Sequence, residues 1–426
     1  MLDLKQIREN PEIFRTAFKN RGGKFLPNLE ELLTVEAERR EKTQEAEALR
    51  THQNRISKKI GELKKAGQVV PAELAKEAAE LKQKFDSGNG MVKELDAKTE
   101  FLLLRLPNIP DTSVPLGGGP QDNKVVAQWA PEGKPLELPF SAKDHKDLGE
   151  SLGILDFEKA VALSGSRFAL LKGKGAALER ALVSFMLDLH INEHSYQEIF
   201  PPFIVTEKTL QSSGQLPFLE EDAYRLDRGD GYLIPTAEVA LTNLHREEII
   251  EEASLPKAYV SYSACFRREA GSFGKDTRGL IRNHQFNKVE LVRFCAPEKS
   301  SDELELLRKH AEEVLKRLEI PYHVLLLCTG DMGIWSAKTY DLEVWMPGEK
   351  KWREISSISN CTDFQARRCQ TKVKRQDGKK EFLHTLNASG LAIGRTFAAI
   401  LENCQKSDGH VVVPQALRKY LNFQEI

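Results

Sequence analysis

The apolar positions between residues 74 and 102 recur in alternating steps of four and three. The positions that keep this spacing are Leu74, Ala78, Leu81, Phe85, Gly88, Val92, Leu95, Thr99 and Leu102. A sustained repeat of this kind is typical of a coiled-coil seam. The stretch before it follows the same register at Leu32, Val35, Ala46, Leu49, Gln53, Ile56, Ile60 and Leu63. The pattern therefore predicts two long helices over about 29–104, joined at 66–71 as an antiparallel hairpin.

Beyond residue 120 helical patterns alternate with strand-like ones. Amphipathic helices are predicted over 175–190 and 301–320, the second opened by a Ser/Asp cap. Short β-rich runs occupy 199–205, 258–267, 288–296, 322–328 and 340–346. Several of these runs follow one another without a helix between them, which favours an antiparallel sheet. The fold class expected is α+β, with a mainly antiparallel sheet flanked by helices and a helical arm before it.

A segment rich in proline and glycine, LPNIPDTSVPLGGGP at 106–120, separates the two patterns. Such a composition is typical of a linker or of the entry to a domain. We expect an N-terminal domain over 1–106, a linker over 107–120 and a second domain over 121–426.

Composition excludes more than it identifies. The chain has 62 Lys and Arg against 63 Asp and Glu, and 40% of its 426 residues are hydrophobic, as in ordinary globular proteins. Its six cysteines form no CxxC pair, which disfavours a disulfide framework and a structural zinc site. No apolar run is long enough to span a membrane, and the N-terminal stretch carries acidic residues, unlike a leader peptide. We therefore expect a cytoplasmic protein that does not bind membranes.

Charge is uneven along the predicted arm. Residues 30–47 are mainly acidic, whereas the end of the first helix is basic through Arg50, Arg55, Lys58, Lys59, Lys64 and Lys65. One interpretation is a solvated helix face. The other is a lever that presents positive charge to a phosphate backbone. The charge pattern alone does not separate the two.

Four short blocks carry residues suited to chemistry. In the first, at 235–245, Thr236 and Glu238 would share one side if the segment were extended, a weak signal by itself. The second, at 265–294, is dense in arginine around a glycine-rich middle that includes Arg278. Guanidinium groups fixed on a strand, a loop and a returning strand suit a triphosphate, although an ion-paired hairpin would have a similar composition.

The third and fourth blocks lie near the C-terminus. At 352–368, Glu354 and Ser357 are a plausible oxygen pair for Mg²⁺, although Glu354 alone could be a surface residue. At 384–405, Asn387 and Ser389 lead through glycines into a helix that begins near Arg395. A helix start with an arginine attracts anions, while the small residues would equally suit tight packing. No P-loop pattern is present, so any ATP site is of another kind.

Taken together, the blocks resemble the motifs of a known enzyme family. FRREAG at 266–271, RGLIRNHQFNKVE at 278–290 and SGLAIGRT at 389–396 are similar to motifs 2 and 3 of class II aminoacyl-tRNA synthetases. TAE at 236–238, REISSISN at 353–360 and HTLNASG at 384–390 resemble the versions found in seryl-tRNA synthetases. The helix at 175–190 resembles motif 1, and the arm resembles that family's tRNA-binding arm, so the resemblance covers essentially the whole chain.

The resemblance implies a reaction and its participants. The expected activity is activation of L-serine with ATP and Mg²⁺ to seryl-adenylate, followed by transfer to the terminal adenosine of tRNA(Ser). Selenocysteine tRNA, tRNA(Sec), is a further candidate substrate. The resemblance also implies a homodimer through motif 1, and a role for the basic end of the arm in holding tRNA.

Residue roles follow from the same resemblance, position by position. The ATP-binding residues it implies are Arg267, Arg268, Glu269, Arg282, Asn283, Phe286, Glu354, Ile355, Ser356, Ser357 and Arg395. The serine-binding residues it implies are Thr236, Ala237, Glu238, Arg267, Glu290, Asn387 and Ser389. Glu354 and Ser357 are the implied metal ligands, and Arg267, Arg395 and Glu354 the implied catalytic residues. Glu290 is the best match to the acceptor for the substrate hydroxyl.

Four positions depart from the family pattern. Arg268 stands where a small residue is common, Ser195 replaces a motif 1 glycine, Ala388 replaces a glycine beside Ser389, and Ile358 replaces a frequent cysteine. The methyl group of Ala388 is expected to narrow the serine pocket or to forbid a positive φ.

Two other functions compete with the synthetase. A ligase that loads a carrier protein would not need the basic arm. A silent RNA-binding paralogue would not need the charged set Arg267, Glu269, Glu290, Glu354 and Arg395. Both features favour the synthetase.

Overall fold

The computed structural model describes residues 1–132, 137–227, 229, 231–270 and 279–426, and the chain divides into two units. One unit comprises Leu2–Pro107 and the other runs over Asn108–Ile426. The glycine-rich stretch 271–278, with the predicted site candidate Arg278, lies outside the described residues. Among the described residues, no helix combines the length and apolar character needed to cross a membrane.

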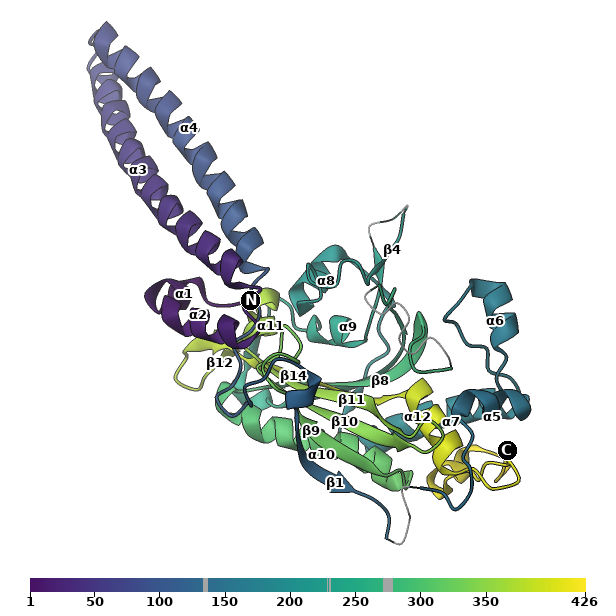
Figure 1. Ribbon diagram of the computed structural model, residues 1–426. Helices are drawn as coiled ribbons and strands as arrows, with labels where there is room; N and C mark the ends of the chain where they lie inside the picture. Colours follow the sequence, from purple (N-terminus) through teal and green to yellow (C-terminus); the bar gives the residue numbers. More distant parts are fainter. Residues whose placement is uncertain (133–136, 228, 230, 271–278) are drawn as a thin grey trace. The chain divides into compact units, whose positions relative to one another are not determined.

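The first unit is built on a long helical hairpin, as predicted. Two short helices, α1 (Leu4–Glu9) and α2 (Pro11–Asn20), precede α3 (Leu26–Lys65) and α4 (Ala72–Leu103), which run side by side (Figure 1). The turn between α3 and α4 falls at the predicted 66–71. Every predicted seam position of α4 is buried or partly buried, with Leu102 and Thr99 the most enclosed. The six cations Arg50, Arg55, Lys58, Lys59, Lys64 and Lys65 are all exposed on α3.

The second unit is organised around an eight-stranded sheet with the order β1-β9-β10-β11-β14-β8-β7-β2. All neighbours in this sheet pair antiparallel except β2 and β7. Its strands are β1 (Lys124–Trp129), β2 (Gln197–Glu198), β7 (Lys257–Phe266), β8 (Gln285–Cys295), β9 (Tyr322–Leu326), β10 (Lys338–Met346), β11 (Lys351–Thr362) and β14 (His384–Ala392). The predicted α+β class with an antiparallel sheet is confirmed.

Two small sheets and eight helices complete the described part of this unit. The remaining strands are β3 (Ile204–Val205), β4 (Tyr224–Arg225), β5 (Tyr232–Leu233), β6 (Ile249–Glu251), β12 (Lys372–Lys374) and β13 (Lys380–Phe382). The helices are α5 (His145–Ser151), α6 (Phe157–Ser164), α7 (Lys174–Asn192), α8 (Glu207–Ser213), α9 (Glu238–Thr242), α10 (Ser300–Arg317), α11 (Phe364–Cys369) and α12 (Ile393–Asn403).

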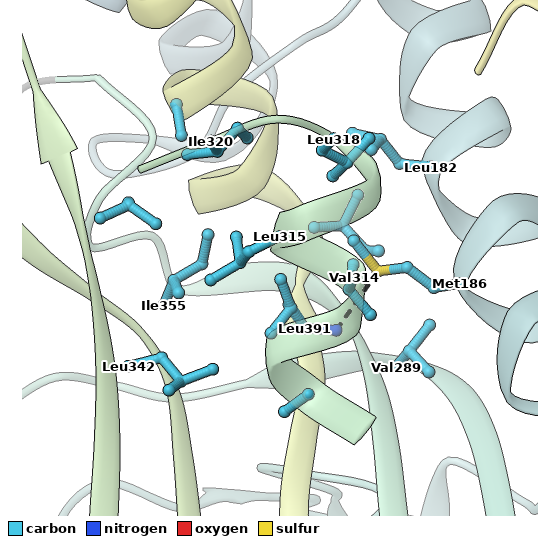
Figure 2. Close-up of a cluster of buried hydrophobic side chains, with 14 of the residues drawn as sticks. Leu182, Met186, Val289, Val314, Leu315, Leu318, Ile320, Leu342, Ile355 and Leu391 are labelled. Atoms are coloured by element: carbon cyan, nitrogen blue, oxygen red, sulfur yellow. Dashed lines mark hydrogen bonds between the residues drawn. The ribbon is translucent and has the colours of Figure 1, made fainter. Parts of the chain in front are cut away.

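One face of the large sheet is buried under helices. Figure 2 shows Met186 of α7 beside Val314 of α10 and Leu391 of β14, and Leu182 of α7 beside Leu318. Because successive strand residues point to opposite faces, the same strands present polar side chains on their other face. In β8, Val289 and Leu291 enter this core while Glu290 between them does not. The sheet therefore separates an apolar core from a polar cavity.

Two local predictions need correction. Only residues at the end of the predicted run 199–205 form a strand, because the two central prolines cannot donate to a ladder. The predicted Ser/Asp cap of α10 is absent, since a 3-10 turn at Pro297–Lys299 runs directly into the helix. Asp302 and Glu303 instead lie in its first turn, where they interact favourably with the helix dipole.

The conformation of Ser195 explains why a glycine is usual at that position. Ser195 is exposed between α7 and β2 and has a φ of 60°. A side chain in this left-handed region brings its Cβ close to backbone oxygen, which glycine avoids.

Replacing Ser195 by glycine should therefore stabilise the second unit. We expect the free energy of unfolding to rise by about 0.5–1 kcal/mol, because relief of the left-handed strain exceeds the extra entropy that glycine has in the unfolded chain. Urea denaturation of wild type and Ser195→Gly measures this difference. Ser195→Ala is the control and should give no gain, because it keeps the Cβ; equal stability of all three proteins would contradict the argument.

Candidate active site

The polar face of the large sheet encloses a cavity of about 340 Å³. Strands β8, β11 and β14, the segment that follows β7 and the start of α12 contribute to its walls. The predicted site residues that line it are Thr236, Glu238, Arg267, Glu269, Arg282, Asn283, Phe286, Glu290, Glu354, Ile355, Ser357, Asn387, Ser389 and Arg395. The four sequence blocks, which span some 170 residues of chain, thus meet in one place.

One end of the cavity holds two buried carboxylates beside one lysine. Glu238 and Glu290 are 4% and 2% exposed, and the Lys288 ammonium forms an ion pair with Glu290. Burial, reinforced by the charge of Glu290, raises the pKa of Glu238 to about 7. Burial also raises the pKa of Glu290, although the charge of Lys288 and the hydroxyl of Thr236 act in the opposite direction. This end can accept one further positive group.

Short polar contacts fix the orientation of these carboxylates. The Thr236 hydroxyl donates to Glu290 Oε2 at 3.1 Å and accepts from the backbone N–H of Glu238 at 3.2 Å. Glu238 Oε1 accepts from Gln365 Nε2 at 2.7 Å and from Asn387 Nδ2 at 3.1 Å. Because the neighbouring groups are themselves buried and bonded, the site is preorganised for a small polar ligand.

The other end of the cavity is rich in arginine. The Arg267 guanidinium lies 5.2 Å from the ring centre of Phe286 and donates through Nε to the Pro235 carbonyl at 3.3 Å. Arg282 donates to Glu269 Oε2 at 3.2 Å. Glu269 has a φ of 52°, a conformation that is uncommon for a residue with a side chain and is frequent at functional sites.

The third arginine stands in the first turn of α12. Arg395 donates through Nη1 to the Glu354 carbonyl at 2.7 Å and through Nε to the Ile281 carbonyl at 3.3 Å. These contacts hold its side chain between β11 and the segment that leads into β8. Guanidinium groups fixed in this way suit several oxygens of one polyphosphate.

Oxygen-bearing side chains lie near Arg395. Glu354 and Ser357 line the cavity, and Asp341 of β10 is paired in register with Ser357 of β11. Burial, followed by the charge of Glu354, raises the pKa of Asp341 well above its usual range. Among the residues that the structure describes, no hydrogen-bond donor reaches Asp341 Oδ1.

Comparison with known proteins identifies the chain's relatives. Residues 1–110 match the family model of the seryl-tRNA synthetase N-terminal domain, and residues 223–404 match that of the class II tRNA synthetase core domain (G, H, P, S and T). Serine–tRNA ligases of Pelotomaculum thermopropionicum and Caldicellulosiruptor saccharolyticus are 51% and 54% identical to the chain. In each case the match covers 99% of this chain, and it covers 98% and 99% of the two relatives.

The chain belongs to the seryl-tRNA synthetase family. It is a class II enzyme with serine–tRNA ligase activity. A seryl-tRNA synthetase from Pyrococcus horikoshii, solved as a complex with ATP, has 40% identity and a TM-score of 0.92, and the match covers 100% of this chain and 99% of that one. The fold and activity that the sequence motifs implied are therefore confirmed.

Three predicted site residues do not line the cavity of this seryl-tRNA synthetase family member. Ala237 is buried behind Thr236, and Ser356 points away to donate to the Ser389 carbonyl at 2.6 Å. Arg268 is exposed, and its guanidinium lies 5.2 Å from the ring centre of Tyr224. The Ser356 hydroxyl thus contacts the backbone of Ser389, a residue that lines the cavity, whereas Arg268 faces solvent.

The departures from the synthetase pattern have local explanations. Ala388 and Ile358 are paired neighbours on β14 and β11, and both belong to the apolar core. The Ala388 methyl group therefore lies on the face of the sheet opposite the cavity, and Ala388 has extended backbone within its strand. The expectation that Ala388 narrows the serine pocket or strains the backbone is wrong, because strand alternation turns it away from Ser389.

Sequence reasoning missed several residues of the cavity. Lys288 could have been found, because it precedes Glu290 by two residues and so shares its face of β8. Gln215, Gly333 and Trp335 also line the cavity, but they come from loops without a local pattern. Their places depend on tertiary packing, which the sequence does not display.

Proposed function

We propose that the cavity carries out both steps of the serine–tRNA ligase reaction, with serine at its acidic end and ATP at its arginine end. A carboxylate oxygen of serine would attack the α-phosphorus of ATP, and the bond from that phosphorus to pyrophosphate would break. A hydroxyl of the terminal ribose of tRNA(Ser) would then attack the seryl carbonyl and release AMP. The observation that carries the proposal is the single cavity with buried carboxylates at one end and three fixed arginines at the other.

The acidic end suits the ammonium and hydroxyl groups of serine. Glu238 is proposed to accept from the ammonium group, whose charge would offset the excess negative charge beside Lys288. Glu290, already oriented by Thr236, is proposed to accept from the substrate hydroxyl. Free alanine, bound in place of serine, would leave the buried Glu290 carboxylate without a hydroxyl partner. A buried acceptor left unpaired in this way discriminates strongly against such a substrate. Asn387 and Ser389 would complete the walls of this pocket.

The arginine end suits the nucleotide. We propose that Phe286 stacks on the adenine ring, that Glu269 and Asn283 lie near it, and that Arg267 contacts the α-phosphate. Arg282 and Arg395 would hold the outer phosphates. Phosphoryl transfer of this kind depends mainly on positioning and on charge stabilisation, so fixed arginines matter more than a strong base.

The oxygen cluster fits Mg²⁺. A hard cation takes oxygen ligands and commonly binds through one or two carboxylates together with phosphate oxygens. Glu354 and Ser357 would hold the ion, and the unpartnered oxygen of Asp341 supports a cation in this place. When bound, the ion would neutralise phosphate charge as the pyrophosphate leaves.

The two units suggest separate tasks. We propose residues 1–106 as a tRNA-binding domain, 107–120 as a linker and 121–426 as the catalytic domain. The division of the chain between Pro107 and Asn108 supports the first boundary. The linker is tied to the catalytic unit, since Asn108 Nδ2 donates to the carbonyls of Trp335 at 3.0 Å and Cys361 at 2.9 Å. The site of action proposed is the cytoplasm, where the tRNA is used.

A homodimer is also proposed. The motif 1 elements α7 and β2 meet at one edge of the large sheet, and in the segment after β2 Phe200 is 76% exposed and Ile204 56% exposed. Exposed apolar side chains at an open sheet edge are typical of an interface. Sedimentation should give twice the chain mass of 48.1 kDa, and a monomer at micromolar concentration would contradict the proposal.

The function is tested by amino-acid-dependent exchange of pyrophosphate into ATP. Serine should support exchange, whereas threonine, alanine, glycine and cysteine should support little. Glu290→Gln should lower serine-dependent exchange by about 100-fold, because a buried acceptor for the hydroxyl is weakened. Glu158→Gln, an exposed change on α6, is the matched control. Exchange with glycine or alanine would instead indicate a carrier-loading ligase, and no exchange would indicate a silent paralogue.

The raised pKa of Glu238 predicts a pH-dependent affinity for serine. Glu238 must be ionised to accept the ammonium group, and its pKa of about 7 means that it gains a proton as the pH falls below 7. The KM for serine should therefore rise by about fivefold between pH 7 and pH 6, since the ionised fraction of a group with a pKa of about 7 falls from about one half to about one eleventh. The KM for ATP serves as the control. In Glu238→Gln the KM should be high and independent of pH; a flat wild-type profile would contradict the assignment.

The basic end of α3 predicts a salt-dependent step that involves only tRNA. Changing Lys58, Lys59, Lys64 and Lys65 together to glutamine should lower kcat/KM for tRNA(Ser) by about tenfold or more and should flatten its salt dependence. Exchange without tRNA should be unchanged. Glutamine at Glu38, Glu41 and Glu45 is the matched control on the same helix. Unchanged aminoacylation by the lysine variant would favour the solvated-face interpretation, and the same assay with tRNA(Sec) tests the second acceptor.

A further inference from the structure

A buried histidine lies behind the nucleotide end of the cavity, outside every motif used so far. His145 begins α5 and is 3% exposed, and its ring contacts Glu402 of α12, which is fully buried. His145 Nδ1 lies 2.8 Å from Glu402 Oε1, and His145 Nε2 accepts from the backbone N–H of Leu280 at 3.1 Å. A backbone amide can only donate, so the ring proton is on Nδ1 and points to the carboxylate.

Glu402 is held on both of its oxygens. Besides the histidine ring, Oε1 accepts from the backbone N–H of His145 at 3.0 Å. Oε2 accepts from the backbone N–H groups of Gly348 at 2.8 Å and Glu349 at 3.3 Å. A buried carboxylate with four donors is rigid, because any movement leaves a donor without its partner.

The segment that His145 holds is part of the cavity wall. Leu280, Ile281 and Arg282 follow one another along the lining, and the Ile281 carbonyl accepts from Arg395 Nε at 3.3 Å. Arg395 and Glu402 are seven residues apart on α12 and so share one face of that helix. One helix therefore holds two consecutive residues of this segment, directly at Ile281 and through His145 at Leu280.

Gly279 allows the close approach of the His145 ring to the backbone. A Cβ at this position would lie 2.2 Å from His145 Nε2, and the φ of Gly279 is +73°. Only glycine allows both the backbone conformation and the contact between the histidine ring and the Leu280 amide.

A metal ion is a weaker interpretation of the same cluster. His145, Glu349 and Glu402 bring one ligand atom each within 4.8 Å of one another. However, Nδ1 carries the ring proton and the oxygens of Glu402 already accept four hydrogen bonds. Glu349 also forms an ion pair with Arg353. The lone pairs that a cation needs are occupied.

We propose that His145, oriented by Glu402, is a positioning residue for ATP that fixes the backbone of Leu280 and thereby places Ile281 and Arg282 in the nucleotide end of the cavity. The inference rests on the proposed function of that end. A small displacement of a residue that positions a substrate lowers affinity and rate without altering the reacting groups.

Two variants of His145 separate positioning from general stability. The amide of asparagine can replace Nδ1 and keep the contact with Glu402, but it offers nothing to Leu280. The longer glutamine can place its oxygen where Nε2 accepts from Leu280. We expect His145→Asn to raise the KM for ATP by about tenfold with an unchanged KM for serine, and His145→Gln to remain within about twofold of wild type. Gly279→Ala should reproduce the defect of His145→Asn.

Direct nucleotide binding makes the test independent of exchange. Trp335 lines the cavity, so its fluorescence reports the Kd for ATP in each variant even if the chain activates no amino acid. Loss of serine-dependent exchange in wild type would contradict the proposed function, whereas an unchanged Kd for ATP in His145→Asn would overturn the positioning role. Equal defects in ATP and serine affinity in both variants, matched by equal losses of melting temperature, would also overturn it. Loss of ATP affinity on chelator dialysis, restored by Zn²⁺ and absent in the variants, would establish the metal site instead.

Discussion

Burial of Glu238 and Glu290 beside a single lysine is the constraint around which the catalytic unit is arranged. Two carboxylates removed from water are costly unless donors surround them, because the interior cannot replace the lost hydration. The structure supplies those donors from distant parts of the chain: Thr236, Gln365 and Asn387 each contribute a hydrogen bond. Gln365 is in turn held by Thr385 at 2.7 Å. The sheet, its loops and α11 are thus tied together by the requirement to satisfy one small group of charges.

The central strands contribute to the apolar core on one face and to the cavity on the other. This explains which elements of the fold could be predicted from the sequence. The seam of α3 and α4 repeats over many turns within one stretch of chain, so local spacing predicted it and even located the turn. Strand β8 was predicted because its apolar residues dominate. Strands β11 and β14 were recognised as chemical blocks but not as strands, because one face of each carries serine, threonine or asparagine for the cavity. The residues that line the cavity are the ones that obscure the strand pattern.

The candidate site residues divide in the same way, into those that a local pattern reveals and those that only tertiary packing brings to the site. Those inside a recognisable motif, such as Arg267 and Glu290, lie in the cavity as the resemblance implied. Asp341 and His145 could not be predicted, since each reaches the site only through pairing or packing with elements far away in sequence. Arg268 and Ala237 show the converse: adjacency to a motif residue says little about a side chain. Arg268 lies after the end of β7 and faces solvent, and Ala237 is the buried residue that precedes α9.

The helical hairpin completes its own apolar seam, with α3 and α4 burying each other's leucines inside one unit of the chain. Nothing in that seam draws on the residues that surround Glu238 and Glu290. Under the proposed division of tasks, natural selection could alter the two surfaces independently: substitutions along the hairpin would change which nucleic-acid shape is held, while the choice of amino acid would stay with the cavity. Such modularity would allow the hairpin to change together with its RNA partner during evolution while the residues of the substrate pocket stay the same.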